Sequence, residues 1–211
     1  MHFKKHKVIP KRSSEILMKF IENKNLNGDL TYQHILHTLG NRAFGIVILF
    51  FALPSILPFS VIPGVAVVFS FPIVILAFEM ILGRKSIWLP KRIAQKTISH
   101  TRITEIISAV IPYVLQLERL AKPRLTFMTY HLMKIINGIT ILFLACLLML
   151  PIPFSNFIFG ALLAIFSMGM IEKDGFLISI GYLCFIVYLS FIYVLALHAI
   201  EALLFIKNLS S

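Results

Sequence analysis

Two carboxylates stand at the ends of long apolar stretches, where an acidic side chain can relay protons or contact a polar substrate. Glu79 is the only charged residue of the first stretch, and Glu172 follows the second. An acidic residue within or beside a membrane-spanning segment is by default a functional candidate. The alternative is an interfacial carboxylate that pairs with the adjacent Arg84 or Lys173. Both interpretations are compatible with the sequence.

Other reactive residue types form weaker patterns. His198 and Glu201 lie three residues apart on one face of a predicted helix, but two ligands do not make a metal site. A polar spot near the membrane edge is the favoured interpretation of this pair. The sequence contains no nucleophile elbow, no phosphate-binding glycine loop and no paired-cysteine motif. We therefore predict no enzyme, no metal and no cofactor.

The composition predicts a membrane protein. Hydrophobic residues make up 58% of the 211 residues, charged residues only 14%, and the mean hydropathy is +0.89, which is too apolar for a soluble domain of this length. The net charge of +11 comes from two basic blocks beside the apolar stretches. That pattern retains loops in the cytoplasm and attracts anionic lipid, so we expect no nucleic-acid partner. Cys146 and Cys184 lie in apolar runs and predict no disulfide.

The elements that position these residues follow from hydrophobic patterning, and we expect an all-α polytopic membrane protein. Its segments are basic N-terminal interfacial helices (1–42), a first apolar hairpin (43–83), a basic amphipathic connector (84–134), a second apolar hairpin (135–175) and a terminal transmembrane helix (176–211).

The N-terminal segment has helical periodicity from residue 13 to 42, with a turn near 25–29. Ser13 or Ser14 is a candidate cap for its first helix. These helices either lie on the membrane surface or form a small soluble cap; both alternatives fit. In the connector, isoleucines and valines recur at helical spacing from Ile103 to Val114 among charged residues, which predicts an amphipathic helix rather than a span.

Prolines divide both apolar stretches. The helix before Pro54 contains about eleven apolar residues, or roughly 16 Å, against a hydrocarbon core of about 30 Å, so it cannot span alone. The piece from 64 to 82 is long enough if Pro72 only kinks it. Because both ends of the first stretch are basic, we expect either an even number of crossings or a re-entrant hairpin.

The two apolar stretches match each other at a fixed offset of 93 positions. Gly45 recurs as Gly138, Pro58 as Pro151 and Glu79 as Glu172. We predict an internal repeat, although chains rich in Leu, Ile and Phe also produce chance identities. Corresponding segments broken by proline are typical of transporters, with a binding site between the repeats. Prolines that simply end ordinary spans are the alternative.

The predicted substrate-binding residues are those at the two turns and at the acidic ends: Glu79, Arg84, Pro58, Pro63, Gly64, Pro151, Pro153, Asn156, Glu172, Lys173 and Asp174.

Five short motifs occur along the chain in a characteristic order: LPSILPFSVIPG (53–64), GRKSIWLP (83–90), LERLAKPRL (117–125), PIPFSN (151–156) and EKDG (172–175). With these motifs the chain resembles the ExoD family of bacterial exopolysaccharide-synthesis membrane proteins over roughly residues 14–207. Members often carry Arg where this chain has Lys173. Lysine keeps the positive charge but lacks the guanidinium group that makes bidentate hydrogen bonds.

The resemblance implies a multi-pass protein of the bacterial inner membrane that takes part in producing or exporting exopolysaccharide, without implying a reaction. Such assembly uses anionic polyprenyl-phosphate lipids, so we expect this chain to bind or transport an anionic or lipid-linked substrate. The alternative is a membrane scaffold that organises synthesis enzymes. Expected head-group contacts are Lys85, Arg119, Lys122 and Arg124, which also fit simple positive-inside anchors.

Overall fold

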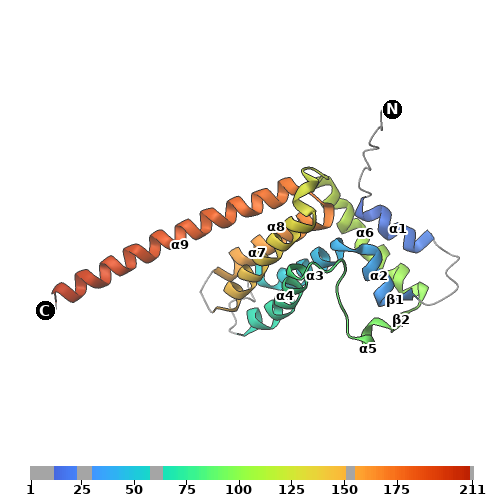
Figure 1. Cartoon of the computed structure of the whole chain (residues 1–211), viewed down its shortest axis with the longest axis horizontal. Helices are drawn as coiled ribbons and strands as arrows, with labels where there is room; N and C mark the ends of the chain where they lie inside the picture. Colours follow the sequence, from blue (N-terminus) through green and yellow to red (C-terminus); the bar gives the residue numbers. More distant parts are fainter. Residues whose placement is uncertain (1–11, 23–29, 58–63, 151–154, 210–211) are drawn as a thin grey trace.

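The chain folds into a bundle of helices with one long helix projecting from it (Figure 1). The structure, a computed structural model, describes residues 12–22, 30–57, 64–150 and 155–209. The helices are α1 (Ser13–Glu22), α2 (Tyr32–Leu39), α3 (Asn41–Ile56), α4 (Val65–Ile81), α5 (Lys91–Ala94), α6 (His100–Leu120), the 3-10 helix η2 (Thr126–Thr129), α7 (His131–Met149), α8 (Ser155–Glu172) and α9 (Gly175–Leu209). The all-α class is therefore confirmed.

Two very short strands, which the sequence did not predict, join the N-terminal segment to the connector. β1 (Leu30–Thr31) pairs antiparallel with β2 (Thr97–Ile98). Each strand has only two residues, so the pairing adds a local tie and leaves the helical architecture unchanged. The predicted turn near 25–29 lies outside the described residues.

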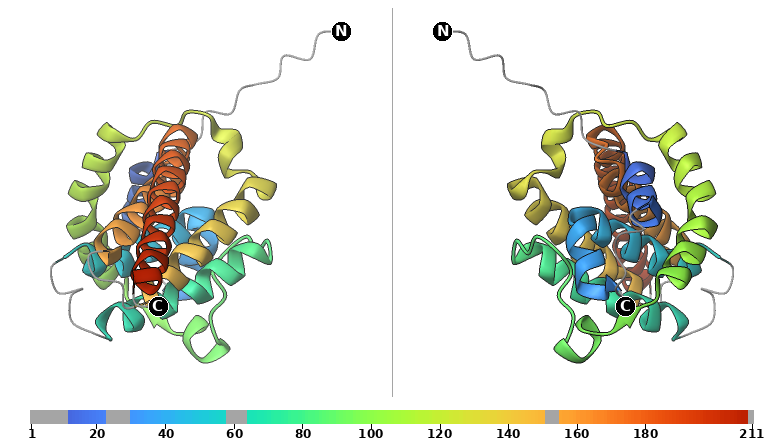
Figure 2. Two further views of the ribbon diagram at one scale, coloured as in Figure 1. Left: turned by 90° about the vertical axis from the view of Figure 1, so that its left-hand side faces the viewer. Right: turned by 90° about the vertical axis from the view of Figure 1, so that its right-hand side faces the viewer.

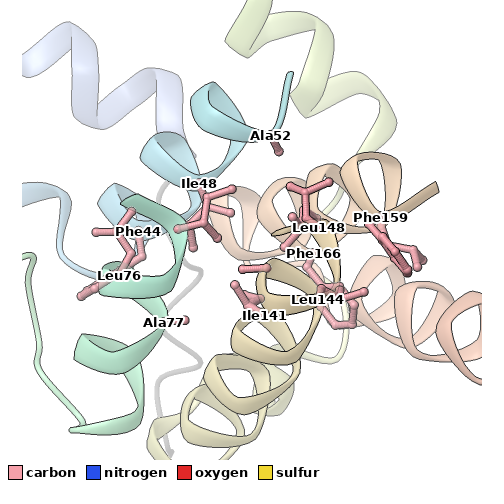
Figure 3. Close-up of a cluster of buried hydrophobic side chains, with 14 of the residues drawn as sticks. Phe44, Ile48, Ala52, Leu76, Ala77, Ile141, Leu144, Leu148, Phe159 and Phe166 are labelled. Atoms are coloured by element: carbon pink, nitrogen blue, oxygen red, sulfur yellow. The ribbon is translucent and has the colours of Figure 1, made fainter. Parts of the chain in front are cut away.

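The core lies among α3, α4, α7 and α8, which come from the two predicted hairpins. Each hairpin packs chiefly on the other: α3 runs along α8, and α4 along α7. Helices that are apolar on all sides have to be buried by protein or lipid. Figure 3 shows their side chains meeting, with Phe44 and Ile48 from α3, Ile141 and Leu144 from α7, and Phe166 from α8.

Two glycines allow the hairpins to approach closely. A Cβ at Gly45 would lie 2.8 Å from the Ser167 carbonyl oxygen on α8, and a Cβ at Gly138 would lie 3.0 Å from Met80 Cβ on α4. In lipid, helix association depends on close packing, and small residues permit it. Both crossings therefore depend on the missing side chain.

Helix α3 does not end before Pro54, so the predicted eleven-residue helix is wrong. It continues to Ile56 with Pro54 in its last turn, and α4 likewise runs through Pro72. Proline removes one backbone hydrogen bond and crowds the preceding turn. Packing against the other hairpin holds both helices together across this defect. A bend of 104° separates α2 from α3 at Gly40, whose φ is +56°.

The amphipathic helices α1 and α6 pack on each other at one end of the bundle, through Leu17, Ile103, Ile107 and Val114. The predicted amphipathic helix is thus confirmed as α6. Ser13 is the first residue of α1, and its hydroxyl donates to the Ile171 carbonyl at 3.1 Å rather than capping its own helix. The adjacent Ser14 N–H donates to Glu118 Oε1 at 2.8 Å. Both contacts fasten α1 to its neighbours.

Helix α9 begins in the bundle and then leaves it. Its first half is held by Tyr182, whose hydroxyl donates to Asn137 Oδ1 at 2.7 Å, and by Tyr188, whose ring packs edge-on against Phe159. Beyond this point the side chains described are exposed, and the helix carries the C-terminus away from the other elements (Figure 1). Figure 2 shows α9 foreshortened, with its C-terminal end towards the viewer on the left.

Three described helices are long and apolar enough to cross a membrane, namely residues 131–149, 155–172 and 175–198. The bent pair of α2 and α3 would make a fourth if both helices belong to one span, and α4 is apolar but shorter. These helices support the membrane class expected from composition.

Candidate functional site

A cavity of about 450 Å³ opens where the N-terminal ends of α3 and α7 meet the segment after α4. Its lining is cationic and polar, and we call it the basic cavity: Asn41, Gly83, Lys85, Thr126, Thr129, Tyr130, His131, Lys134 and Lys173. A smaller crevice that shares Asn41, Lys134 and Lys173 reaches Asn137 and Met170. Among the described residues that line the basic cavity, none carries a carboxylate.

Lys134 is the most buried cation of the basic cavity, with only 4% of its surface exposed. Its ammonium donates to Asn41 Oδ1 at 2.8 Å and to the Arg84 carbonyl, and lies 4.3 Å from the centre of the Phe44 ring. An ammonium has three N–H donors, and within the described residues these two oxygens accept from it. A buried charge requires such fixed partners. The Lys134 position is therefore rigid.

Lys173 and Lys85 complete the trio of cations. Lys173 directly follows α8 and has a φ of +55°, a conformation that is strained for a non-glycine residue. Burial lowers the pKa of Lys173, and the nearby Arg42 guanidinium lowers it further. Lys85 is exposed at the cavity mouth. An anion in the cavity would relieve the repulsion among these cations.

Further hydrogen-bond donors come from η2 and from the start of α7. Thr126, Thr129, Tyr130 and His131 all line the basic cavity. The chain reaches this conformation through Leu125, which has a φ of +46° just before η2. The first backbone N–H groups of α7 lie at this wall, and the end of a helix that carries them favours negative charge.

Glu79 and Glu172 are both buried but do not line the basic cavity. Glu79 Oε2 accepts the Trp88 N–H at 2.8 Å, while the Arg84 guanidinium lies over the Trp88 ring at 5.5 Å. Glu172 hydrogen-bonds with Ser13 at the start of α1 and lies near the charged groups of Arg42 and Glu118. Both carboxylates thus brace the elements around the cavity.

Asp174 fastens the start of α9 to the connector. Its Oδ1 accepts the Phe176 N–H at 3.0 Å, which caps α9, and its Oδ2 accepts the Lys122 N–H at 2.9 Å. Gly175 N–H donates to the Arg124 carbonyl at 2.6 Å. A Cβ at Gly175 would lie 2.1 Å from the Leu125 carbonyl oxygen, so the close docking of these two motifs requires glycine.

The profile of a family described as exopolysaccharide synthesis, ExoD, matches residues 13–194. The chain belongs to the ExoD family. Membership implies involvement in exopolysaccharide synthesis, and the resemblance noted from the motifs is confirmed.

Two relatives match over most of this ExoD-family chain. It is 31% identical over 165 residues to the uncharacterized protein slr1875 of Synechocystis, covering 78% of this chain and 77% of that one. It is 32% identical over 154 residues to Protein ExoD of Rhizobium meliloti, covering 71% of this chain but only 63% of the relative. The chain therefore spans less than two thirds of the Rhizobium protein. No solved structure matches it.

In this ExoD-family fold the predicted site residues separate into two groups. Gly64 begins α4 with a φ of +93°, and Asn156 lies in the first turn of α8. Gly64 and Glu79 lie at opposite ends of α4, and Asn156 and Glu172 lie at opposite ends of α8. Pro58, Pro63, Pro151 and Pro153 lie outside the described residues. Of the described residues, Gly64 and Asn156 therefore lie apart from the charged residues.

Within the predicted head-group contacts, only Lys85 lines the basic cavity; Arg119, Lys122 and Arg124 are exposed elsewhere. Sequence reasoning missed Lys134, Asn41 and the polar wall of η2. The sequence held one signal of this pair, because the offset of 93 positions that relates the two apolar stretches also relates Asn41 to Lys134. The His198 Nδ1 atom lies 2.8 Å from the Val194 carbonyl oxygen of its own helix. In the described parts of the chain no cluster of three or more His, Cys, Asp or Glu could hold a metal.

Proposed function

We propose that this ExoD-family chain is a non-enzymatic, multi-pass protein of the bacterial inner membrane that binds the phosphate head group of a lipid-linked precursor in the basic cavity. The carrying observation is the lining: three lysines and several neutral donors, with no carboxylate among the described lining residues. Ammonium groups and hydroxyls suit phosphate, which offers several strong acceptor oxygens.

A lipid rather than a soluble anion is favoured by the place of the cavity. It lies at the start of α7 and the end of α8, which are two of the three described helices that are apolar enough to span. A phosphate there can keep its acyl or prenyl chain against the apolar helix surfaces. Lysines at the ends of spans are typical of the cytoplasmic side, which is where lipid-linked sugars are made.

The architecture that we propose is an internal repeat of two parallel hairpins, α3–α4 and α7–α8. Three observations support it. Gly45 and Gly138, related by the offset of 93, both occupy close helix crossings. Asn41 and Lys134, related by the same offset, hydrogen-bond each other. Each hairpin packs mainly on the other, as expected for two halves related by a pseudo-two-fold axis.

The second candidate is the membrane scaffold, and one feature of α6 favours it. One face of α6 packs on α1. On the rest of its surface an exposed apolar stripe at helical spacing is formed by Ile106, Val110 and Tyr113. A partner enzyme docking there would need this stripe and would be indifferent to the lysines of the basic cavity. Substitutions on the two surfaces therefore separate the two candidates.

The test is complementation of a strain that lacks its own ExoD-family protein, with exopolysaccharide output and membrane accumulation both measured. The paired variant Lys85→Gln/Lys173→Gln removes two cavity charges, and Arg119→Gln/Arg124→Gln removes two exposed charges outside it. We expect the first variant to accumulate but lose output, and the second to retain output. Retained output in the cavity variant, or loss only with Ile106→Ser/Val110→Ser, would favour the scaffold instead.

A further inference from the structure

A second cavity, of about 550 Å³, adjoins the basic cavity. Its volume is within the range of about 300–1,000 Å³ that is common for small-molecule sites. Its polar wall comes from Gln33, Arg84, Lys85, Ser86, Trp88 and Gln95, and we call it the Trp88 cavity. Lys85 lines both cavities, so the two cavities meet at this residue.

The Trp88 cavity differs from the basic cavity in its chemistry. Its distinguishing groups are two carboxamides, each of which donates and accepts hydrogen bonds, and an indole ring that is 58% exposed. A pyranose presents the matching features, namely hydroxyls that donate and accept at the rim and an apolar C–H face that can lie on an aromatic ring. Lys85 is shared with the basic cavity, and the Arg84 guanidinium lies over the indole ring. The groups that remain for a ligand, two amides and an aromatic ring, suit a sugar.

Two contacts hold Trp88 in place, one to its backbone and one to its ring. Its backbone N–H donates to the Glu79 carboxylate at 2.8 Å, and Glu79 is 6% exposed. The Arg84 guanidinium lies over the indole at 5.5 Å, an arrangement in which the cation is attracted to the ring face. The ring is thus held at the cavity wall although much of its surface is open, which is the condition for a stacking platform.

We infer that the Trp88 cavity binds the sugar of the same lipid-linked molecule whose phosphate occupies the basic cavity, with Lys85 between the two groups. This inference rests on the proposed function, and it specifies the ligand as a glycosyl unit joined to phosphate. Gln33 from α2 and Gln95 after α5 would contact sugar hydroxyls, and Trp88 would contact the apolar face of the ring.

Trp88 also supplies the readout, because it is the single tryptophan of the chain. The experiment titrates the purified full chain in detergent with polyprenyl diphosphate–glucose and with polyprenyl diphosphate, following indole fluorescence and, in parallel, native mass spectrometry. We expect the glucosylated lipid to bind at least about tenfold more tightly, equivalent to about 1.4 kcal/mol, and to alter the fluorescence more strongly.

The variants are Trp88→Ala and Gln95→Ala, with binding followed by mass spectrometry. Alanine retains the backbone N–H that Glu79 accepts, so Trp88→Ala removes only the ring. We expect both variants to bind the two lipids equally, at the affinity of the wild type for the sugar-free lipid. An interfacial anchor, the common role of tryptophan at a membrane edge, would instead give no sugar preference in the wild type, and that result overturns the inference.

The outcomes separate this inference from the proposed function. Equal binding of both lipids by the wild type contradicts only the sugar site. Failure to bind either lipid contradicts the basic cavity as a lipid site. Glucose 1-phosphate serves as a soluble probe: if it binds as tightly as the glucosylated lipid and is lost in Trp88→Ala, the sugar site stands and the lipid source is wrong.

Discussion

The Lys134 ammonium hydrogen-bonds Asn41 Oδ1 at 2.8 Å, and these two residues are 93 positions apart, the same offset that relates the two apolar stretches. Corresponding residues of two repeats touch only near the axis that relates the repeats. The basic cavity is lined by both residues, which places it at the proposed pseudo-two-fold axis. Sites between repeats are common in membrane transporters.

Gly45→Ala should destabilise the bundle. The added methyl would lie 2.8 Å from the Ser167 carbonyl oxygen, which belongs to a helix backbone and cannot rotate away. Overpacking of this kind costs about 1–3 kcal/mol. Gly138→Ala should cost less, because its nearest contacts begin at 3.0 Å. Thermal unfolding in detergent measures both, with the exposed substitution Ser108→Ala as control. Wild-type stability of both variants would contradict the close crossing.

Asp174 makes two separable contributions, and two substitutions distinguish them. Asp174→Ala removes the cap of α9 and the contact with the Lys122 N–H, for an expected loss of about 1–2 kcal/mol. Asp174→Asn can still cap, but has no second acceptor oxygen for Lys122. We expect Asp174→Asn to retain most of the free energy of unfolding and to increase protease cleavage within residues 121–125. Equal loss in both variants would show that the cap contributes little.

The pH dependence of binding should include a contribution from Lys173, one of three lysines that line the basic cavity. Its pKa is lowered from the ordinary 10.5, chiefly by burial, so it loses its proton at a lower pH than a free lysine does. An anion favours the charged form, and the affinity for polyprenyl phosphate should therefore fall as pH rises through this lowered pKa. Titration above about pH 7.5 avoids the second phosphate ionisation near 6. Lys173→Arg, which stays charged, should make the decrease of affinity with pH less steep; an unchanged slope would exclude Lys173 as a titrating group.

Both hairpins should reach the same depth in the membrane, because α3 packs along α8 and α4 along α7. In a variant without Cys146 and Cys184, single cysteines at the exposed positions Leu57 and Phe157 should react with an impermeant thiol reagent added to intact cells. A cysteine at Ser99 should react only after permeabilisation. Labelling of Phe157→Cys without Leu57→Cys would make the first hairpin re-entrant and break the equivalence of the halves.

The sequence predicted the features that depend on composition and periodicity. The apolar hairpins, the amphipathic α6 and the long α9 all follow from local patterning. The end of α3 was misplaced at Pro54 because contacts with α8, distant in sequence, sustain the last turn. For the same reason, local patterning did not predict the candidate site. Lys85, Lys134 and Lys173 lie on three separate segments, and only the docking of those segments brings their charges to one cavity.

For individual motif residues the structure shows contacts that local neighbours do not predict. Arg84 is the adjacent candidate partner of Glu79, whose carboxylate accepts a hydrogen bond from the Trp88 N–H. Asp174 was placed among substrate ligands, and its oxygens bind backbone N–H groups of Phe176 and Lys122. Short polar motifs at helix ends often serve the unpaired backbone groups there, and sequence spacing alone does not distinguish this role from ligand binding.

The central claim is that the basic cavity binds the phosphate of a membrane lipid, and equilibrium binding of polyprenyl monophosphate to the purified full chain tests it most directly. Native mass spectrometry should detect one bound lipid on the wild type. Lys85→Gln/Lys173→Gln should weaken binding by at least about tenfold, whereas Arg119→Gln/Arg124→Gln should leave it unchanged. Equal affinities for all three proteins, or no binding by the wild type, would contradict the account.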